Sequence, residues 1–149
     1  MEIKRFEIGN EKSISEVESK LDISLPNDYK EFLHQNNGAK VDDGYFFVKD
    51  LNEYIMMDTF FGISISKKAL DIIEVNNEFD GEIPFKSILI GDEPGGGLIL
   101  LVNDGEDNGI YYYDHSYSFE QSSDEKNSYI IANTFQDFVD MLSTSPPNK

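Results

Sequence analysis

The polar loop from Asp104 to Gly109 has the residue types of a cation site. Asp104, Glu106 and Asn108 fall at positions 1, 3 and 5 of a calcium-binding loop, and Gly109 falls at position 6. Position 12, where a bidentate glutamate is needed, is His115. The segments on both sides have the pattern of strands, whereas helices flank a calcium loop of this kind. We therefore predict a solvated hairpin loop and no metal site.

A run of three glycines, residues 95–97, is the second candidate for chemistry. A phosphate-binding loop needs glycines before a helix and a lysine close by. Here Asp92 and Glu93 precede the glycines, and a strand pattern follows them. The run therefore indicates a tight turn or close packing rather than phosphate binding.

The two histidines, His34 and His115, do not form a recognisable catalytic set. His34 follows the apolar stripe of a predicted helix, which indicates a position at the boundary of the core. His115 follows Asp114, but neighbours on a strand point to opposite faces, so adjacency does not make a catalytic triad. The sequence also lacks a Gly-x-Ser-x-Gly elbow. We predict no enzyme activity and no cofactor.

Acidic and aromatic side chains are interleaved in the C-terminal half of the chain. Tyrosines beside carboxylates are typical of a protein-binding face. The alternative is that alternate tyrosines fill the core while the acids are solvated on the other face. The candidate partner-binding residues from this segment are Asp104, Glu106, Asp107, Tyr112, Asp114, Tyr117 and Glu120.

Four segments have helical periodicity and could position these residues. Ser13 with Glu16 forms a capping box before the first, and the second begins near Pro26. Phe32 lies in the middle of the apolar stripe of the second helix, so we expect it to be buried in the core. A weaker helix is predicted over residues 67–77, and a last one opens at Thr134.

Strand patterns fill the rest of the chain. They cover residues 45–48, 59–65, 87–90, 98–102, 110–113 and 129–131. The segments 98–102 and 110–113 are joined by the short polar loop and should form an antiparallel hairpin. The order of elements predicts an α+β fold, with a mostly antiparallel sheet packed against about four helices.

Length and charge limit the classes of function. The 149 residues suit one domain, which we place at residues 1–142, followed by a disordered tail at 143–149. The net charge of −17 repels phosphate backbones and anionic lipids, so nucleic acid and membranes are unfavourable partners. There is no cysteine, and the charged N-terminus has no apolar signal segment. These features predict a cytoplasmic location.

Three motifs in a fixed order resemble the SUKH superfamily of Smi/Knr-like proteins. The segment 25–33 reads Leu-Pro-Asn-Asp-Tyr-Lys-Glu-Phe-Leu, and Asn37-Gly38 follows it. Later come Ile-Gly-Asp at 90–92, a glycine pair at 96–97, and a Phe-x-x-Phe helix at 135–138. The resemblance covers the chain from about Ile14 to Leu142.

The resemblance implies an α+β fold in which the motif residues are mainly structural. Bacterial members of the superfamily are mostly immunity proteins that bind and neutralise a cognate toxin, often a nuclease. It therefore implies that this chain binds a basic toxin domain and blocks its active site. A non-catalytic regulatory adaptor or scaffold of the Smi/Knr type is the alternative.

Overall fold

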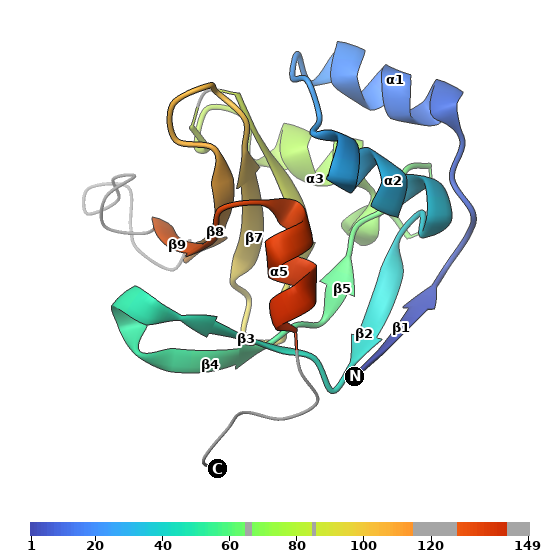
Figure 1. Cartoon of the computed structure of the whole chain (residues 1–149). Helices are drawn as coiled ribbons and strands as arrows, with labels where there is room; N and C mark the ends of the chain where they lie inside the picture. Colours follow the sequence, from blue (N-terminus) through green and yellow to red (C-terminus); the bar gives the residue numbers. More distant parts are fainter. Residues whose placement is uncertain (65–66, 85, 115–127, 143–149) are drawn as a thin grey trace.

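The structure is a computed structural model that describes residues 1–64, 67–84, 86–114 and 128–142. Its elements are arranged in space as Figure 1 shows. In chain order, they are β1 (Glu2–Arg5), α1 (Glu11–Lys20), α2 (Asn27–Gln35), β2 (Ala39–Asp42), β3 (Tyr45–Val48), η1 (Lys49–Leu51), β4 (Glu53–Met56), β5 (Thr59–Phe60), η2 (Lys68–Leu70), α3 (Ile72–Glu78), β6 (Ser87–Asp92), β7 (Leu98–Val102), β8 (Gly109–Tyr113), β9 (Ser128–Ala132) and α5 (Phe135–Met141).

Seven strands form one sheet in the order β1-β2-β5-β6-β7-β8-β9, and β3 with β4 forms a separate hairpin. Every pair of neighbouring strands is antiparallel. Helix α5 lies in front of the central strands, and the β3–β4 hairpin lies below it (Figure 1). The predicted α+β fold with a mostly antiparallel sheet and about four helices is thus confirmed.

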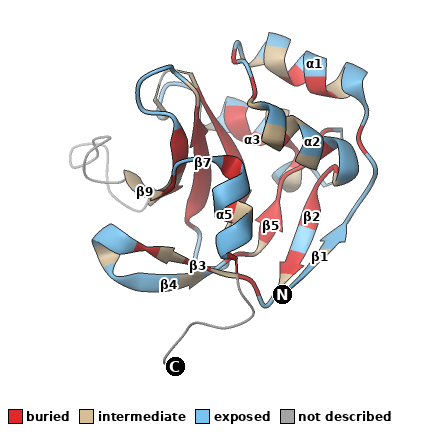
Figure 2. Ribbon diagram, viewed as in Figure 1, coloured by how far each residue is buried: buried red, intermediate tan, exposed pale blue. Residues whose placement is uncertain are grey.

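The core is centred on β7, which is buried at all five residues (Figure 2). Its Leu-Ile-Leu-Leu-Val run has no polar face, as expected for a strand with both sides covered. The predicted hairpin of 98–102 with 110–113 is β7 with β8, in the register Leu98 with Tyr113 and Leu101 with Ile110. Helix α5 covers this region and joins it to the small hairpin, since the rings of Phe138 and Phe46 lie 5.5 Å apart.

The first helix begins earlier than the capping box predicted. Asn10 is the N-cap residue, and its side-chain oxygen accepts a hydrogen bond from the Ser13 amide at 2.8 Å. Asparagine is as good an N-cap as serine, and the two candidates are three residues apart. Ile14 and Val17 are the buried residues of this helix and lie on its inner face.

The second helix follows Pro26, which is the N-cap residue and not the first helical residue. Its stripe buries Tyr29 and Leu33, but Phe32 is only half-buried, so the prediction of a fully buried Phe32 was wrong. Phe32 lies at the edge of an aromatic cluster, with ring centroids 4.7 Å from Phe60 and 5.1 Å from Phe135. It covers the core rather than filling it.

The predicted helix over 67–77 is two shorter elements, η2 and α3. Asp71 separates them because its extended backbone makes it the N-cap of α3, where its carboxylate accepts hydrogen bonds from the Ile73 and Glu74 amides. Ile72 and Val75 face the core. The N-cap Thr134 of the last helix is as predicted, with its hydroxyl accepting from the Asp137 amide at 3.0 Å.

Two buried asparagine amides join segments that are distant in the sequence. The Asn37 side chain exchanges hydrogen bonds with the backbone of Ile63, and the Asn76 side chain does so with Leu89. The Asp28 carboxylate accepts from the Gln136 amide and so links α2 to α5. Asp28 and Asn37, which belong to the motif 25–38, therefore hold distant segments of the fold together. Within the described residues, no helix is long and apolar enough to cross a membrane.

Candidate partner-binding surface

The loop between β7 and β8 is held in shape by its own side chains. The Asp104 Oδ1 accepts hydrogen bonds from the amides of Glu106 at 2.9 Å and Asp107 at 2.7 Å. These bonds stabilise the charged form and lower the pKa of the Asp104 carboxyl. The Asn108 Oδ1 accepts from the Gly105 amide at 2.9 Å. The loop joins two strands, as predicted, and its acidic side chains Asp104, Glu106 and Asp107 are exposed.

Tyr112 lies on the inner side of β8 and is 8% exposed. Its ring packs directly over Gly97, where a side chain would lie 2.5 Å from the Tyr112 Cε1. The Gly97 amide donates to the Glu93 Oε1 at 2.6 Å, which closes the turn between β6 and β7. Burial and the nearby charges of Glu93 and Asp114 raise the pKa of the Tyr112 phenol. The glycines thus serve a turn and close packing, as predicted.

The structure divides the predicted partner-binding residues into two groups. The loop acids precede β8, whereas Asp114 follows it and is half-buried. A five-residue strand spans roughly 17 Å, so one small contact cannot include both groups. Tyr117 and Glu120 lie outside the described residues. The structure brings Tyr112 and Asp114 together with Glu93, which sequence reasoning did not select.

A second acidic group, Asp58 and Asp92, lies where β5 pairs with β6. Burial, followed by the charge of Asp58, raises the pKa of Asp92 from 3.8 to about 6. The Asp92 Oδ1 is buried and has no hydrogen-bond partner in the part of the chain that the structure describes. Asp58 forms an ion pair with Lys40. Sequence reasoning missed this pair because the two aspartates are 34 residues apart and meet only through strand pairing.

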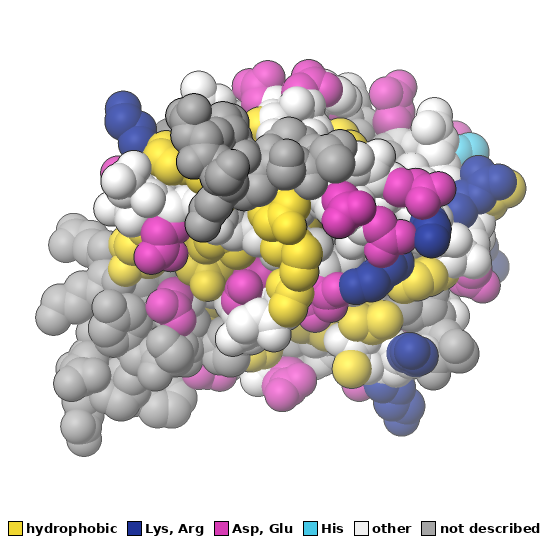
Figure 3. Space-filling view, turned by 90° about the horizontal axis from the view of Figure 1, so that it is seen from below, with side chains coloured by type: hydrophobic (Ala, Val, Ile, Leu, Met, Phe, Trp, Pro, Cys, Tyr) yellow, Lys and Arg dark blue, Asp and Glu magenta, His cyan; other side chains and the backbone are white. Residues whose placement is uncertain are grey.

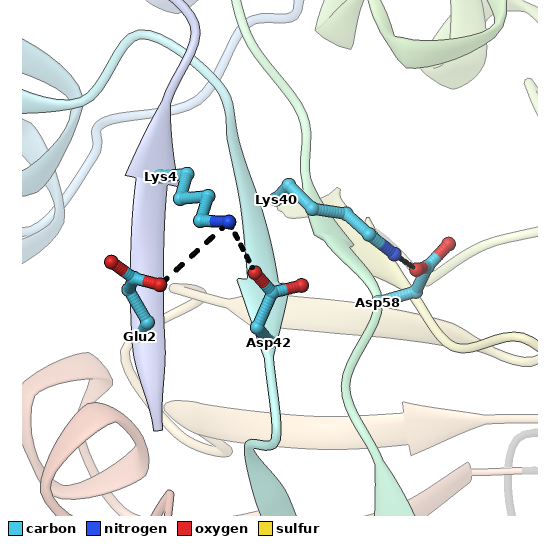
Figure 4. A network of polar contacts seen from close by, with 5 residues as sticks. All are labelled: Glu2, Lys4, Lys40, Asp42 and Asp58. Atoms are coloured by element: carbon cyan, nitrogen blue, oxygen red, sulfur yellow. Dashed lines mark hydrogen bonds and ion pairs between the residues drawn. The ribbon is translucent and has the colours of Figure 1, made fainter.

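Lys4 on β1 and Lys40 on β2 form three ion pairs in this region, one of which includes Asp58 (Figure 4). The Lys4 Nζ lies 3.0 Å from the Asp42 Oδ2 and 3.7 Å from the Glu2 Oε1, and these carboxylates raise the pKa of Lys4. Lys40 and Asp58 form the third pair. Both lysines are thereby paired with carboxylates.

The described residues offer little for catalysis. In residues 1–64, 67–84, 86–114 and 128–142, no three His, Asp or Glu side chains are grouped as metal ligands would be. His34 is exposed in an open hollow between α1 and α2, which Glu11, Glu18 and Glu31 also line. His115 lies outside the described residues. The hollow is open to the surface, unlike the enclosed pockets that usually hold small substrates.

The chain belongs to the SMI1 / KNR4 family (SUKH-1), whose pattern it matches over residues 9–141. This span includes all four helices of the described residues and all strands except β1. The resemblance found in the sequence motifs is therefore confirmed. Proteins of the SUKH group are commonly toxin immunity proteins and are generally non-catalytic.

Two proteins of Bacillus subtilis (strain 168) are similar to this chain. Uncharacterized protein YnaB is 32% identical over 129 residues, which cover 87% of this chain and 72% of that protein. SPbeta prophage-derived uncharacterized protein YokK is 24% identical over 158 residues, which cover 93% of this chain and 77% of that protein. Both relatives extend the similarity over most of the chain, in agreement with the family match.

Proposed function

We propose that this chain is an immunity protein that binds a cognate toxin domain, most simply a nuclease, and blocks its active site. The observation that carries the proposal is membership of the SUKH-1 family over residues 9–141, since proteins of this group commonly have that role. One relative is derived from a prophage, which is consistent with a role in conflict between genomes.

The charge of the chain supports a basic partner. A net charge of −17 in 149 residues creates a negative potential over the surface, which attracts a cationic protein and repels nucleic acid and anionic membranes. A nuclease has a cationic groove for its substrate, and an acidic protein can occupy that groove in place of the nucleic acid. We therefore propose a protein partner and neither nucleic acid nor lipid.

The exposed acids Asp104, Glu106 and Asp107 are proposed contributors to this attraction. They project from a loop whose backbone is held by internal hydrogen bonds to the Asp104 and Asn108 side chains. Exposed charges of this kind accelerate encounter more than they tighten the final complex. Asp114 and Tyr112, at the opposite end of β8, lie closer to the β3–β4 hairpin, because the ring of Tyr112 lies 6.2 Å from that of Phe46.

The direct test uses the toxin domain encoded beside the gene for this chain. Increasing amounts of the chain are added to that domain while its enzymatic activity and the complex are both measured. We expect inhibition to reach completion at one chain per toxin domain. A complex that leaves the toxin fully active would contradict the immunity role and favour the adaptor role. The absence of any complex would contradict the proposed partner.

A further inference from the structure

We infer that the outward face of the β3–β4 hairpin is the docking surface for the basic toxin domain. This inference rests on the proposed function and adds to it the place where the partner binds. The hairpin is built from residues 45–56 and lies below α5 (Figure 1). Its register pairs Tyr45 with Met56 and Phe47 with Tyr54, so these four side chains share one face.

The two faces of the hairpin have different environments. On the inward face, Phe46 and Val48 are completely buried, and Phe46 packs on Phe138. On the outward face, Tyr54 is 38% exposed and Met56 is 40% exposed. Tyr45 and Phe47 are half-buried but do not belong to the hydrophobic side chains that pack against the core. The alternation therefore places four large apolar side chains on the outward face, of which two are exposed and two are half-buried.

Two of the outward side chains pack against each other. The rings of Phe47 and Tyr54 lie 4.8 Å apart with their planes tilted by 49°. Met56 also lines an open hollow together with Met1, Asp42 and Asp58. Aromatic and methionine side chains held near the centre of a contact are the residue types that carry most binding energy.

Charge around the hairpin specifies the kind of partner. Between residues 42 and 58, Asp42 and Asp58 are paired with Lys4 and Lys40, which leaves three exposed acids, Asp43, Asp50 and Glu53, against one lysine, Lys49. Hydrophobic side chains gather in the middle of the underside, with acidic side chains on both sides of them and Lys and Arg side chains among the acids on one side (Figure 3). An apolar centre with an acidic rim is complementary to a protein surface that has lysines and arginines around an apolar patch.

The test is the affinity of the neighbouring toxin domain for matched single variants, measured by titration calorimetry. Tyr54→Lys and Met56→Lys place a positive charge on the proposed surface, where a basic partner would be repelled. Ile8→Lys is the control, because Ile8 is 63% exposed and lies outside the hairpin. This substitution changes the net charge by the same amount as the hairpin variants. We expect each hairpin variant to lose about 30-fold or more in affinity, as at a binding hot spot, and Ile8→Lys to lose less than about 3-fold.

The outcomes separate this inference from the proposed function. If the unchanged chain binds and the hairpin variants bind equally well, the docking surface is wrong and the immunity role stands. Greater sensitivity to Asp104→Lys than to Met56→Lys would instead assign docking to the loop before β8. If the unchanged chain forms no complex, both proposals fail.

Thermal unfolding of each variant shows whether that variant folds. If Tyr54→Lys does not fold, the affinity of Met56→Lys still tests the docking surface. Sedimentation of the chain alone tests for a dimer. A dimer that Tyr54→Lys dissociates would assign this face to a second copy of the chain and overturn the inference.

Discussion

The hydroxyl group of Tyr29 is buried and has no hydrogen-bond partner within the described residues. Burial raises the pKa of this phenol, so the group stays neutral. The Tyr29 ring itself packs against Phe135 with centroids 4.9 Å apart. Tyr29→Phe keeps this ring contact and removes the unsatisfied oxygen. We expect the free energy of unfolding to stay equal or to rise by up to about 1 kcal/mol in urea denaturation.

Tyr113→Phe is the matched control for this substitution. Tyr113 is also buried, but its hydroxyl donates to the Glu82 carbonyl at 3.2 Å. Loss of that hydrogen bond should lower the free energy of unfolding by about 1 kcal/mol. A loss at Tyr29→Phe as large as that at Tyr113→Phe would show that the Tyr29 hydroxyl has a favourable interaction.

Asp92 gives the stability a defined dependence on pH. Its pKa is raised to about 6 in the folded chain from an ordinary 3.8, mainly by burial. Between these values the folded chain keeps a proton that the unfolded chain has released, so the contribution of Asp92 to stability falls as pH rises from about 4 to about 6. Asp92→Asn removes the penalty for the buried charge.

We therefore expect Asp92→Asn to raise the free energy of unfolding at pH 7.5 and to change it little at pH 4. Urea denaturation of both proteins across this range gives the difference directly. A difference that is constant with pH, or that is larger at pH 4, would contradict the raised pKa of Asp92.

At the scale of elements, the Asn76 side chain fixes α3 to the central sheet. Its amide donates to the carbonyls of Ile72 at 2.8 Å and Leu89 at 3.0 Å, and its oxygen accepts from the Leu89 amide at 2.8 Å. Asn76→Ala leaves the buried backbone groups of Leu89 without these partners. We expect the free energy of unfolding to fall by about 2–4 kcal/mol.

Asn77→Ala, at the exposed neighbouring residue of the same helix, is the control for this prediction. It should change the free energy of unfolding by no more than about 0.5 kcal/mol. Equal effects of the two substitutions in thermal or urea unfolding would show that the Asn76 side chain does not join α3 to β6.

Elements with a strong pattern could be predicted from the sequence, and the mostly exposed strands could not. β7 is a continuous apolar run and α5 has a threonine cap, so both were placed correctly. β1 and β4 are short and mostly exposed, and only pairing with β2 and β3 makes them strands. The predicted strand over 59–65 is limited to two residues, because only Thr59 and Phe60 have partners on both sides.

The candidate site was predictable only where it depended on local sequence. The loop with Asp104 was expected to be exposed between two strands, and local composition was sufficient for that. The packing of Tyr112 over Gly97 depends on register: Tyr112 pairs with Ile99, and Gly97 lies two residues earlier on the same face. The exposed face of the β3–β4 hairpin likewise follows from pairing with residues 53–56, which sequence periodicity did not identify as a strand.

At the scale of the whole molecule, the net charge should determine the rate of association with the toxin domain. We expect on-rates toward about 10⁸–10⁹ M⁻¹s⁻¹ at low salt. They should decrease steeply as the screening length shortens from ~30 Å at 0.01 M to ~8 Å at 0.15 M salt. Changing Asp104, Glu106 and Asp107 together to lysine shifts the net charge by two per residue, from −17 to −11. Stopped-flow measurements should show a lower on-rate and a nearly unchanged off-rate.

The hairpin variants should have the opposite kinetic effect. Tyr54→Lys and Met56→Lys act on short-range contacts and should mainly raise the off-rate. An on-rate that is independent of salt would contradict electrostatic steering. A loop variant that changes only the off-rate would show that the loop is part of the tight contact.

Survival of cells that produce the toxin domain tests the central claim most directly. The neighbouring toxin domain is expressed from an inducible promoter alone, with this chain, and with the Met56→Lys variant at equal protein levels. We expect the unchanged chain to restore colony counts to those of uninduced cells and Met56→Lys to restore them much less. Equal killing with and without the unchanged chain, together with no complex on gel filtration, would contradict the account.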